Sequence, residues 1–146
     1  MNEIKKIDYL LKTLFKLNRS LITPDNNKTL NLIKKEIPIK MLGSKSSEKV
    51  YDWVIPKEWL VKDAFISDLK SNKIIDFKNN NLHLLGYSHS IDRVMLFKDL
   101  KKKLHTLRKL PKAIPYRTSY YKTDWGFCVN KEQYDLLKKK KKLKVK

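Results

Sequence analysis

The feature that most constrains the fold of this 146-residue chain is a change of sequence pattern at residues 43–47. These residues, Gly-Ser-Lys-Ser-Ser, form a flexible-looking stretch, and hydrophobic residues recur at helical spacing before it. After it the hydrophobic residues come in short β-branched and aromatic runs separated by Asn-rich turns. Such runs are typical of a small antiparallel sheet. The sequence therefore predicts an α+β fold in which helices come first.

Two helices are predicted before the change of pattern. Apolar residues recur at helical spacing from about Glu3 to Leu17, with lysines between them, which predicts an amphipathic helix. Thr23 followed by Pro24 is a helix start signal, because threonine caps a helix and proline fits its first turn. The second helix should stop before Pro38. We expect residues 1–42 to be the helical part of a larger domain.

Residues 43–93 are predicted to form an inserted small antiparallel β-domain. Its turns are Ser71-Asn72 and the run Lys78 to Asn81, which have the composition of turns. The segment 94–137 should contain a return helix that ends at Pro111, followed by an aromatic stretch. The expected strands are Val50 to Val54, Leu60-Val61, Ala64 to Ile66, Ile74 to Phe77 and Leu82 to Leu85.

The densest run of positive charge in the chain is residues 138–146, and the rest of the charge is spread along the whole chain. This segment carries seven lysines and no acid, and without them the net charge of +19 falls to +12. Charge runs of this kind are usually solvated, so we expect 138–146 to be a lysine-rich disordered tail. The remaining charge fits either a functional basic surface or the lysine-rich composition of an AT-rich genome. The two alternatives differ in whether the lysines gather on one face of the fold.

No targeting or membrane-spanning segment is recognisable in the sequence. The N-terminus lacks the apolar core of a signal peptide. No run approaches the roughly 20 apolar residues of a membrane span. The single cysteine, Cys128, cannot form an internal disulfide. We therefore expect a cytoplasmic protein with no membrane partner.

The stretch from residue 114 to 128 is the most aromatic part of the chain. It contains three tyrosines, a tryptophan, a phenylalanine and Cys128. Tyrosine and tryptophan combine a large apolar face with a polar group that needs a partner when buried. This composition suits the wall of a pocket better than an ordinary core strand.

Recognisable catalytic motifs are missing. The three histidines do not combine with other ligands into a zinc site, which needs three or four. We expect His83 to be a sheet histidine, His105 to lie on a solvated helix face and Cys128 to be a small buried hydrophobe. The three glycines are too far apart for a phosphate-binding loop. Arg117 and Lys122 beside aromatic residues suit base stacking, but no single-strand-binding signature is present, so nucleic acid is not the favoured partner.

Two motifs carry a resemblance to a known family. They are Asp-Trp-x-x-Pro-x-Glu-Trp at residues 52–59 and Trp-Gly-Phe-Cys at residues 125–128. With shorter matches in the same order over residues 17–137, the chain resembles the aminopeptidase-like proteins of bacterial polysaccharide-biosynthesis loci. These contain a domain of unknown function and are similar to zinc exopeptidases. The resemblance implies an N-terminal fragment of a larger α/β zinc-exopeptidase-like fold, with a peptide or amide substrate for the intact protein.

The resemblance also implies what this chain lacks. Family members are longer, and a Cys-His-Pro segment followed by Asn-Asp lies downstream of Trp-Gly-Phe-Cys. Zinc is expected in full-length relatives but no metal ligand or catalytic residue is expected here, so the chain should be inactive alone. Because the similarity fades near Leu137, we expect either a truncated product with out-of-frame final residues or a split gene completed by a second chain.

The resemblance gives candidate substrate contacts in the aromatic stretch, namely Arg117, Tyr120, Tyr121 and Trp125. An alternative role for these residues is packing against the rest of the domain. Two other functions stay open. One is a small basic module that binds nucleic acid, and the other is a non-catalytic subunit that completes a partner chain.

Overall fold

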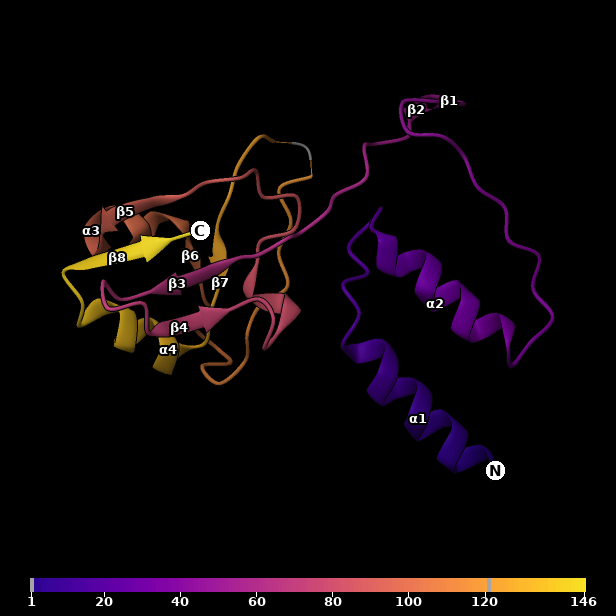
Figure 1. Cartoon of the computed structure of the whole chain (residues 1–146), viewed down its shortest axis with the longest axis horizontal. Helices are drawn as coiled ribbons and strands as arrows, with labels where there is room; N and C mark the ends of the chain where they lie inside the picture. The colour runs from indigo at the N-terminus through magenta and orange to yellow at the C-terminus, as the bar shows by residue number, and fades with distance from the viewer. Residues whose placement is uncertain (1, 121) are drawn as a thin grey trace. The chain divides into compact units, whose positions relative to one another are not determined.

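The computed structural model describes residues 2–120 and 122–146 and divides the chain into two compact units (Figure 1). Unit 1 is Met1–Leu60 and unit 2 is Val61–Lys146. The boundary follows the second motif tryptophan, Trp59, rather than the flexible-looking stretch at residues 43–47. Each unit is described by itself.

Unit 1 begins with the two predicted helices. Helix α1 (Glu3–Phe15) starts at Asn2, whose side chain accepts a hydrogen bond from the backbone of Ile4 at 3.1 Å. Helix α2 (Pro24–Lys34) has Thr23 at its N-cap and proline at the first helical position. The Asp25 carboxylate accepts a hydrogen bond from the Asn18 backbone at 2.9 Å and so fixes the connection between the helices. The polar residues Ser20, Thr23 and Thr29 are buried here.

A short hairpin completes unit 1. Strand β1 (Lys49–Val50) pairs antiparallel with β2 (Trp53–Val54), so the predicted single run is two strands around a tight turn. Tyr51 lies in that turn with a φ of 56° and is 92% exposed. A left-handed backbone is unusual for tyrosine. The Trp59 backbone donates a hydrogen bond to the Ile22 carbonyl at 2.9 Å, which ties the second half of the motif to the connection between α1 and α2.

Unit 2 is built on a four-stranded antiparallel sheet in the order β4-β3-β8-β5. The strands are β3 (Phe65–Ser67), β4 (Lys73–Asp76), β5 (Arg93–Leu96) and β8 (Lys142–Val145). The turn between β3 and β4 is closed by Asp68, whose carboxylate accepts hydrogen bonds from the backbones of Lys70 and Asn72 at 2.9 and 3.0 Å. This turn is the predicted Ser71-Asn72 turn.

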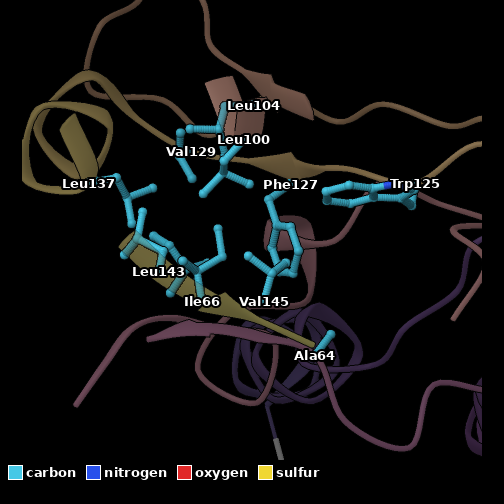
Figure 2. Close-up of a cluster of buried hydrophobic side chains, with 11 residues drawn as sticks. Ala64, Ile66, Leu100, Leu104, Trp125, Phe127, Val129, Leu137, Leu143 and Val145 are labelled. Atoms are coloured by element: carbon cyan, nitrogen blue, oxygen red, sulfur yellow. The ribbon is translucent and has the colours of Figure 1, made fainter. Parts of the chain in front are cut away.

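The hydrophobic core of unit 2 lies against one face of this sheet (Figure 2). Ile66, Leu143 and Val145 point into it from the two central strands and are fully buried. Phe127 lies between these strands and the buried residues Leu100, Leu104 and Val129. Helix α4 (Lys131–Lys138) adds Leu137 to the same cluster. Burial alternates along β8, as is expected of a strand in a sheet that has one face packed.

Residues 138–146 are not the disordered tail that the sequence predicts. β8 lies between β3 and β5, and it pairs with β5 along its whole length and with β3 at Lys144 and Val145. Its side chains alternate, with Leu143 and Val145 buried and the lysines on the other face. Leu143 and Val145 complete the core of unit 2. Because lysines are so frequent here, the alternation of basic and apolar residues that is typical of a strand was not recognised in the sequence.

The predicted return helix in residues 94–111 is also wrong in form. The segment makes β5, a single turn of helix α3 (Phe97–Leu100), the 3₁₀ turn η2 (Lys101–Lys103) and β6 (Leu104–His105). Leu100 and Leu104 are each buried in the same core. Likewise Leu82 to Leu85 does not form a strand, because Asn81–His83 is the 3₁₀ turn η1. The α+β class with a small antiparallel sheet is confirmed.

Candidate functional site

The aromatic stretch folds around residues 84–89, which lie between two of its parts. On one side the Leu85 backbone donates a hydrogen bond to the Gly126 carbonyl at 3.0 Å. On the other side the Gly86 backbone donates to the Arg117 carbonyl at 2.9 Å, and the Ser119 backbone donates to the Gly86 carbonyl at 2.8 Å. These bonds hold both ends of the stretch on one short segment.

The end of the stretch is anchored to unit 2 by a parallel strand pair. Strand β7 (Phe127–Cys128) pairs with β6, so that Leu104 lies opposite Phe127 and His105 opposite Cys128. Gly126 precedes this pair in a confined place, since a Cβ there would lie 2.8 Å from the Lys103 carbonyl oxygen. Only glycine fits that approach without movement of the backbone.

Trp125 is a buried support of the site. Its side chain is 5% exposed, with the Arg93 guanidinium 5.5 Å and the Lys103 ammonium 5.7 Å from the ring centroid. Cations at such distances are attracted to the ring face. The structure therefore brings two positive groups to Trp125, but it leaves little of the indole accessible to a ligand.

Asp124 joins this cluster as its negative partner. Its carboxylate forms an ion pair with Lys103 and accepts a hydrogen bond from the Trp125 backbone at 2.8 Å. The hydrogen bond from Lys103 is the main cause that lowers the pKa of Asp124 below its ordinary value. The carboxylate stays ionised and fixes Lys103 beside the ring.

The other predicted contacts lie near the surface. Arg117 is exposed. Tyr120 is half-buried, and its ring meets the ring of Tyr87 edge-to-face with a centroid separation of 5.4 Å. Tyr87 itself has a φ of 63°, which is uncommon for a residue of this size. Tyr121 lies outside the described residues.

Cys128 is a buried thiol. Its side chain is inaccessible, and burial raises its pKa to about 11, although the charge of Arg117 and a hydrogen bond from the Arg117 backbone act in the opposite direction. A nucleophilic cysteine needs a thiolate at neutral pH. The expectation of a buried hydrophobe is therefore confirmed.

His83 is also held by structural contacts. It is buried in η1, where Nδ1 lies 2.9 Å from the Cys128 carbonyl oxygen and Nε2 lies 3.3 Å from the Gln133 amide nitrogen. Gln133 in turn belongs to the capping box at the start of α4. Both ring nitrogens therefore have partners within the fold, and His83 is a buried histidine next to the sheet rather than a strand residue.

His105 was predicted on a solvated helix face, and that prediction is wrong. It lies half-buried in β6. Burial, followed by the nearby charge of Arg117, lowers its pKa below the ordinary value of 6.5. Spacing alone did not reveal this position, because the leucines four residues apart suggested a helix that does not form.

Metal ligands do not gather in the part of the chain that the structure describes. No group of three or more His, Cys, Asp or Glu side chains in residues 2–120 and 122–146 is placed to hold a metal ion. The residues present therefore do not fit a zinc centre of three or four ligands. Within the same residues, no helix has the length and apolar character needed to cross a bilayer.

Sequence reasoning missed Tyr87, Arg93, Lys103 and Asp124 as members of this site. Of these, only Asp124 has a local signal, since it stands directly before the Trp-Gly-Phe-Cys motif. The other three reach the aromatic stretch through pairings between distant segments. Of the predicted contacts in the aromatic stretch, Trp125 is enclosed whereas Arg117 is exposed.

Comparisons with known proteins give this site a family context. Residues 58–146 match the family described as "Domain of unknown function (DUF2172)". A Clostridium acetobutylicum protein named "Putative polysaccharide biosynthesis protein with aminopeptidase-like domain" is 43% identical over 128 residues, which are 88% of this chain and 30% of the relative. A crystal structure named as a "putative peptidase" of the same organism has a TM-score of 0.89 and 40% identity, over 97% of this chain and 33% of that one. The chain thus spans about a third of the length of these relatives, and the resemblance stated from its motifs is confirmed.

Proposed function

Because this chain belongs to the DUF2172 family, we propose that it supplies the non-catalytic, N-terminal portion of an aminopeptidase-like protein that works in polysaccharide biosynthesis. The observation that carries the proposal is the match of nearly the whole chain to a third of a peptidase-like structure at a TM-score of 0.89. The metal that activates water in such hydrolysis would be held by residues outside this chain, so that the chain is inactive alone.

The chemistry of the described residues supports this role. The thiol of Cys128 is protonated and enclosed, and both nitrogens of His83 are occupied by the fold. The side chains with catalytic potential in this region therefore serve structure. Arg117 is accessible in the same region, and its planar cation pairs well with carboxylates.

We assign Arg117 and Tyr120 to contacts with a peptide or amide substrate, with Tyr121 as a third contact and Trp125 as the support behind them. The backbone of Arg117 accepts a hydrogen bond from Gly86, and the ring of Tyr120 packs edge-to-face with the ring of Tyr87. The exposed Arg117 guanidinium could bind the carboxylate of a substrate through two parallel hydrogen bonds. Trp125 keeps its position because Arg93 and Lys103 lie over its ring.

The test is a chimera of the Clostridium acetobutylicum relative in which this chain replaces the aligned segment. With zinc present, the chimera should hydrolyse aminoacyl-p-nitroanilides as the intact relative does, whereas this chain alone should not exceed buffer containing zinc. Hydrolysis by this chain alone would overturn the non-catalytic assignment. An inactive intact relative would overturn the peptidase assignment.

Substitution of Arg117 in the chimera tests the contact. We expect Arg117→Ala to raise the KM for a dipeptide, which carries the free carboxylate that aminoacyl-p-nitroanilides lack, about 10-fold, as for loss of one charge-assisted hydrogen bond of roughly 1.4 kcal/mol. Arg108→Ala is the matched control, since Arg108 is an exposed arginine of the same unit. If the two substitutions change KM equally, Arg117 is not a substrate contact.

A further inference from the structure

The fold of unit 2 brings together two lysine runs that are distant in sequence. The first is Lys98, Lys101 and Lys102 in α3 and η2, and the second is Lys138 to Lys142, from the last residue of α4 to the first of β8. Leu96 lies opposite Lys142 in the sheet, and the Phe97 backbone donates a hydrogen bond to the Lys141 carbonyl at 3.2 Å. Figure 1 shows α3 next to the turn between α4 and β8, at one end of the sheet. We call these residues the lysine surface.

The lysine surface holds far more positive than negative charge. All eight of its lysines are exposed. Among the ion pairs of the described residues, only Lys140 of this set has an acidic partner, Asp68 at 3.6 Å. Asp99 is the one acid inside the two runs. Like charges this close repel one another and cost stability unless an anion or salt screens them.

Local structure accounts for only part of this cluster. Lysines near the C-terminal ends of α3 and α4 interact favourably with the helix dipoles. One or two cations suffice for each helix end, however, and Lys141 and Lys142 belong to the turn and strand that follow α4. A compositional excess of lysine would scatter over the fold, whereas these eight lysines converge through one strand pairing.

We infer that the lysine surface binds an anionic polysaccharide, a glycan chain that carries carboxylate or phosphate groups. This inference rests on the proposed function for its link to polysaccharide. The chemistry of the surface favours a glycan over a nucleic acid. Lysine is a compact charge on a flexible stem and lacks the planar fork with which arginine reads guanine.

Aromatic residues, on which bases would stack, are not exposed on this surface. The exposed aromatic residues of the described chain are Tyr9, Phe15, Tyr51, Trp53 and Tyr116, and none belongs to the two lysine runs. The aromatic ring next to the surface, Phe97, packs edge-to-face against Tyr134 with a centroid separation of 5.6 Å. The lysine surface can therefore bind a polymer with repeated negative charges, but it has no exposed aromatic ring on which bases would stack.

The test measures binding of the whole chain to fluorescein-labelled polygalacturonate by fluorescence anisotropy, with uncharged dextran and a DNA duplex of similar length as comparisons. We expect polygalacturonate to bind with an affinity that falls as salt rises, because binding releases counterions. The quadruple variant Lys101→Gln, Lys102→Gln, Lys139→Gln and Lys141→Gln should weaken this binding at least about 10-fold, the effect of roughly 1.4 kcal/mol.

The matched control removes four charges elsewhere on unit 2, through Lys62→Gln, Lys78→Gln, Lys109→Gln and Lys112→Gln, all at exposed positions. It should weaken binding no more than about twofold, in keeping with a mainly local effect at physiological salt. Lysine-to-arginine changes at the first four positions should retain binding. Equal losses in the two glutamine variants would show that net charge alone is responsible and would overturn the inference.

Lysine acetylation of the unsubstituted chain, with and without polygalacturonate, tests the same surface without depending on whether the variants fold. Acetylation of Lys101, Lys102, Lys139 and Lys141 should slow when polygalacturonate is added, while acetylation of Lys62 and Lys112 should not change. Tighter binding of DNA than of polygalacturonate would show that the ligand of the lysine surface is a nucleic acid. Binding of neither polymer would overturn the inference that the lysine surface is a binding site. None of these readouts involves hydrolysis, so their outcome is separate from that of the chimera.

Discussion

The two units of this chain differ in how they bury apolar residues. Every buried hydrophobic residue that the structure describes belongs to unit 2, whereas the buried residues of unit 1 are Ser20, Thr23 and Thr29. Helix α1 has no buried residue, and Phe15 on it is 68% exposed. Unit 2 contains a core of its own, but unit 1 is held by caps, turns and backbone hydrogen bonds.

A sequence pattern can therefore specify a helix without supplying the packing that stabilises the helix. The apolar stripe of α1 is sufficient to define a helix, yet most helical stability in proteins comes from packing of that stripe. A segment of about 60 residues also buries too little surface to be stable with a wide margin. We therefore expect the stability of the chain to reside in unit 2, and the following substitutions compare the two units directly.

The largest effect is expected from truncation of one phenylalanine in each unit. Phe127→Ala removes a side chain that is 1% exposed in the centre of the core, and such changes cost about 3–5 kcal/mol. Phe15→Ala removes an exposed ring and should change stability by no more than about 0.5 kcal/mol. Urea unfolding followed by tryptophan fluorescence and circular dichroism measures both. If Phe15→Ala costs as much as Phe127→Ala, the units do not differ in the way described.

A smaller effect is expected from adding one methyl group to a glycine in each unit. Gly126→Ala would place a Cβ 2.8 Å from the Lys103 carbonyl oxygen, and a forced backbone shift of this kind costs about 1–3 kcal/mol. Gly43→Ala is the control, because nothing lies within 4 Å of the added atom. The same unfolding measurement compares them. A neutral Gly126→Ala would mean that β6 and β7 can move apart without loss.

The smallest effect concerns pH, and it should be confined to unit 2 because all three histidines follow residue 60. His105 has a lowered pKa in the folded chain, so the unfolded chain binds its proton first as the pH falls. Stability is therefore complete above about pH 6.5 and decreases below it, by at most about 1.4 kcal/mol per pH unit for one proton. Unfolding in urea between pH 7.5 and 5 measures this slope. His105→Asn should reduce the slope, and an unchanged slope would contradict the assignment.

The sequence was sufficient to predict the elements that depend on local signals. Both helices of unit 1 follow from apolar spacing and from Thr23-Pro24, and the turn of β3 and β4 follows from Ser71-Asn72. These signals act through neighbouring residues, which is why periodicity and turn chemistry detect them. The motif tryptophans also pointed to the correct family.

Pairings between distant segments were beyond local reasoning. The spacing of Leu96, Leu100 and Leu104 fits a long helix, but these leucines lie in β5, α3 and β6, and Leu100 and Leu104 are buried in one core. In the site, the ion pair of Lys103 with Asp124 joins segments that are parallel neighbours only in the fold. Basic and apolar residues alternate from Lys142 to Val145, but the neighbouring lysines led to the prediction of a disordered tail.

The position of β8 in the sheet has a consequence for how the chain acquires its structure during synthesis. β3 and β4 can pair as soon as their turn emerges from the ribosome, but β5 reaches the sheet only through β8. Until residues 142–145 are made, Ile66 and Met95 lack the strand that connects them. Such long-range closure is slow and leaves apolar surface uncovered for longer. We expect nascent chains of unit 2 to engage chaperones until β8 is inserted.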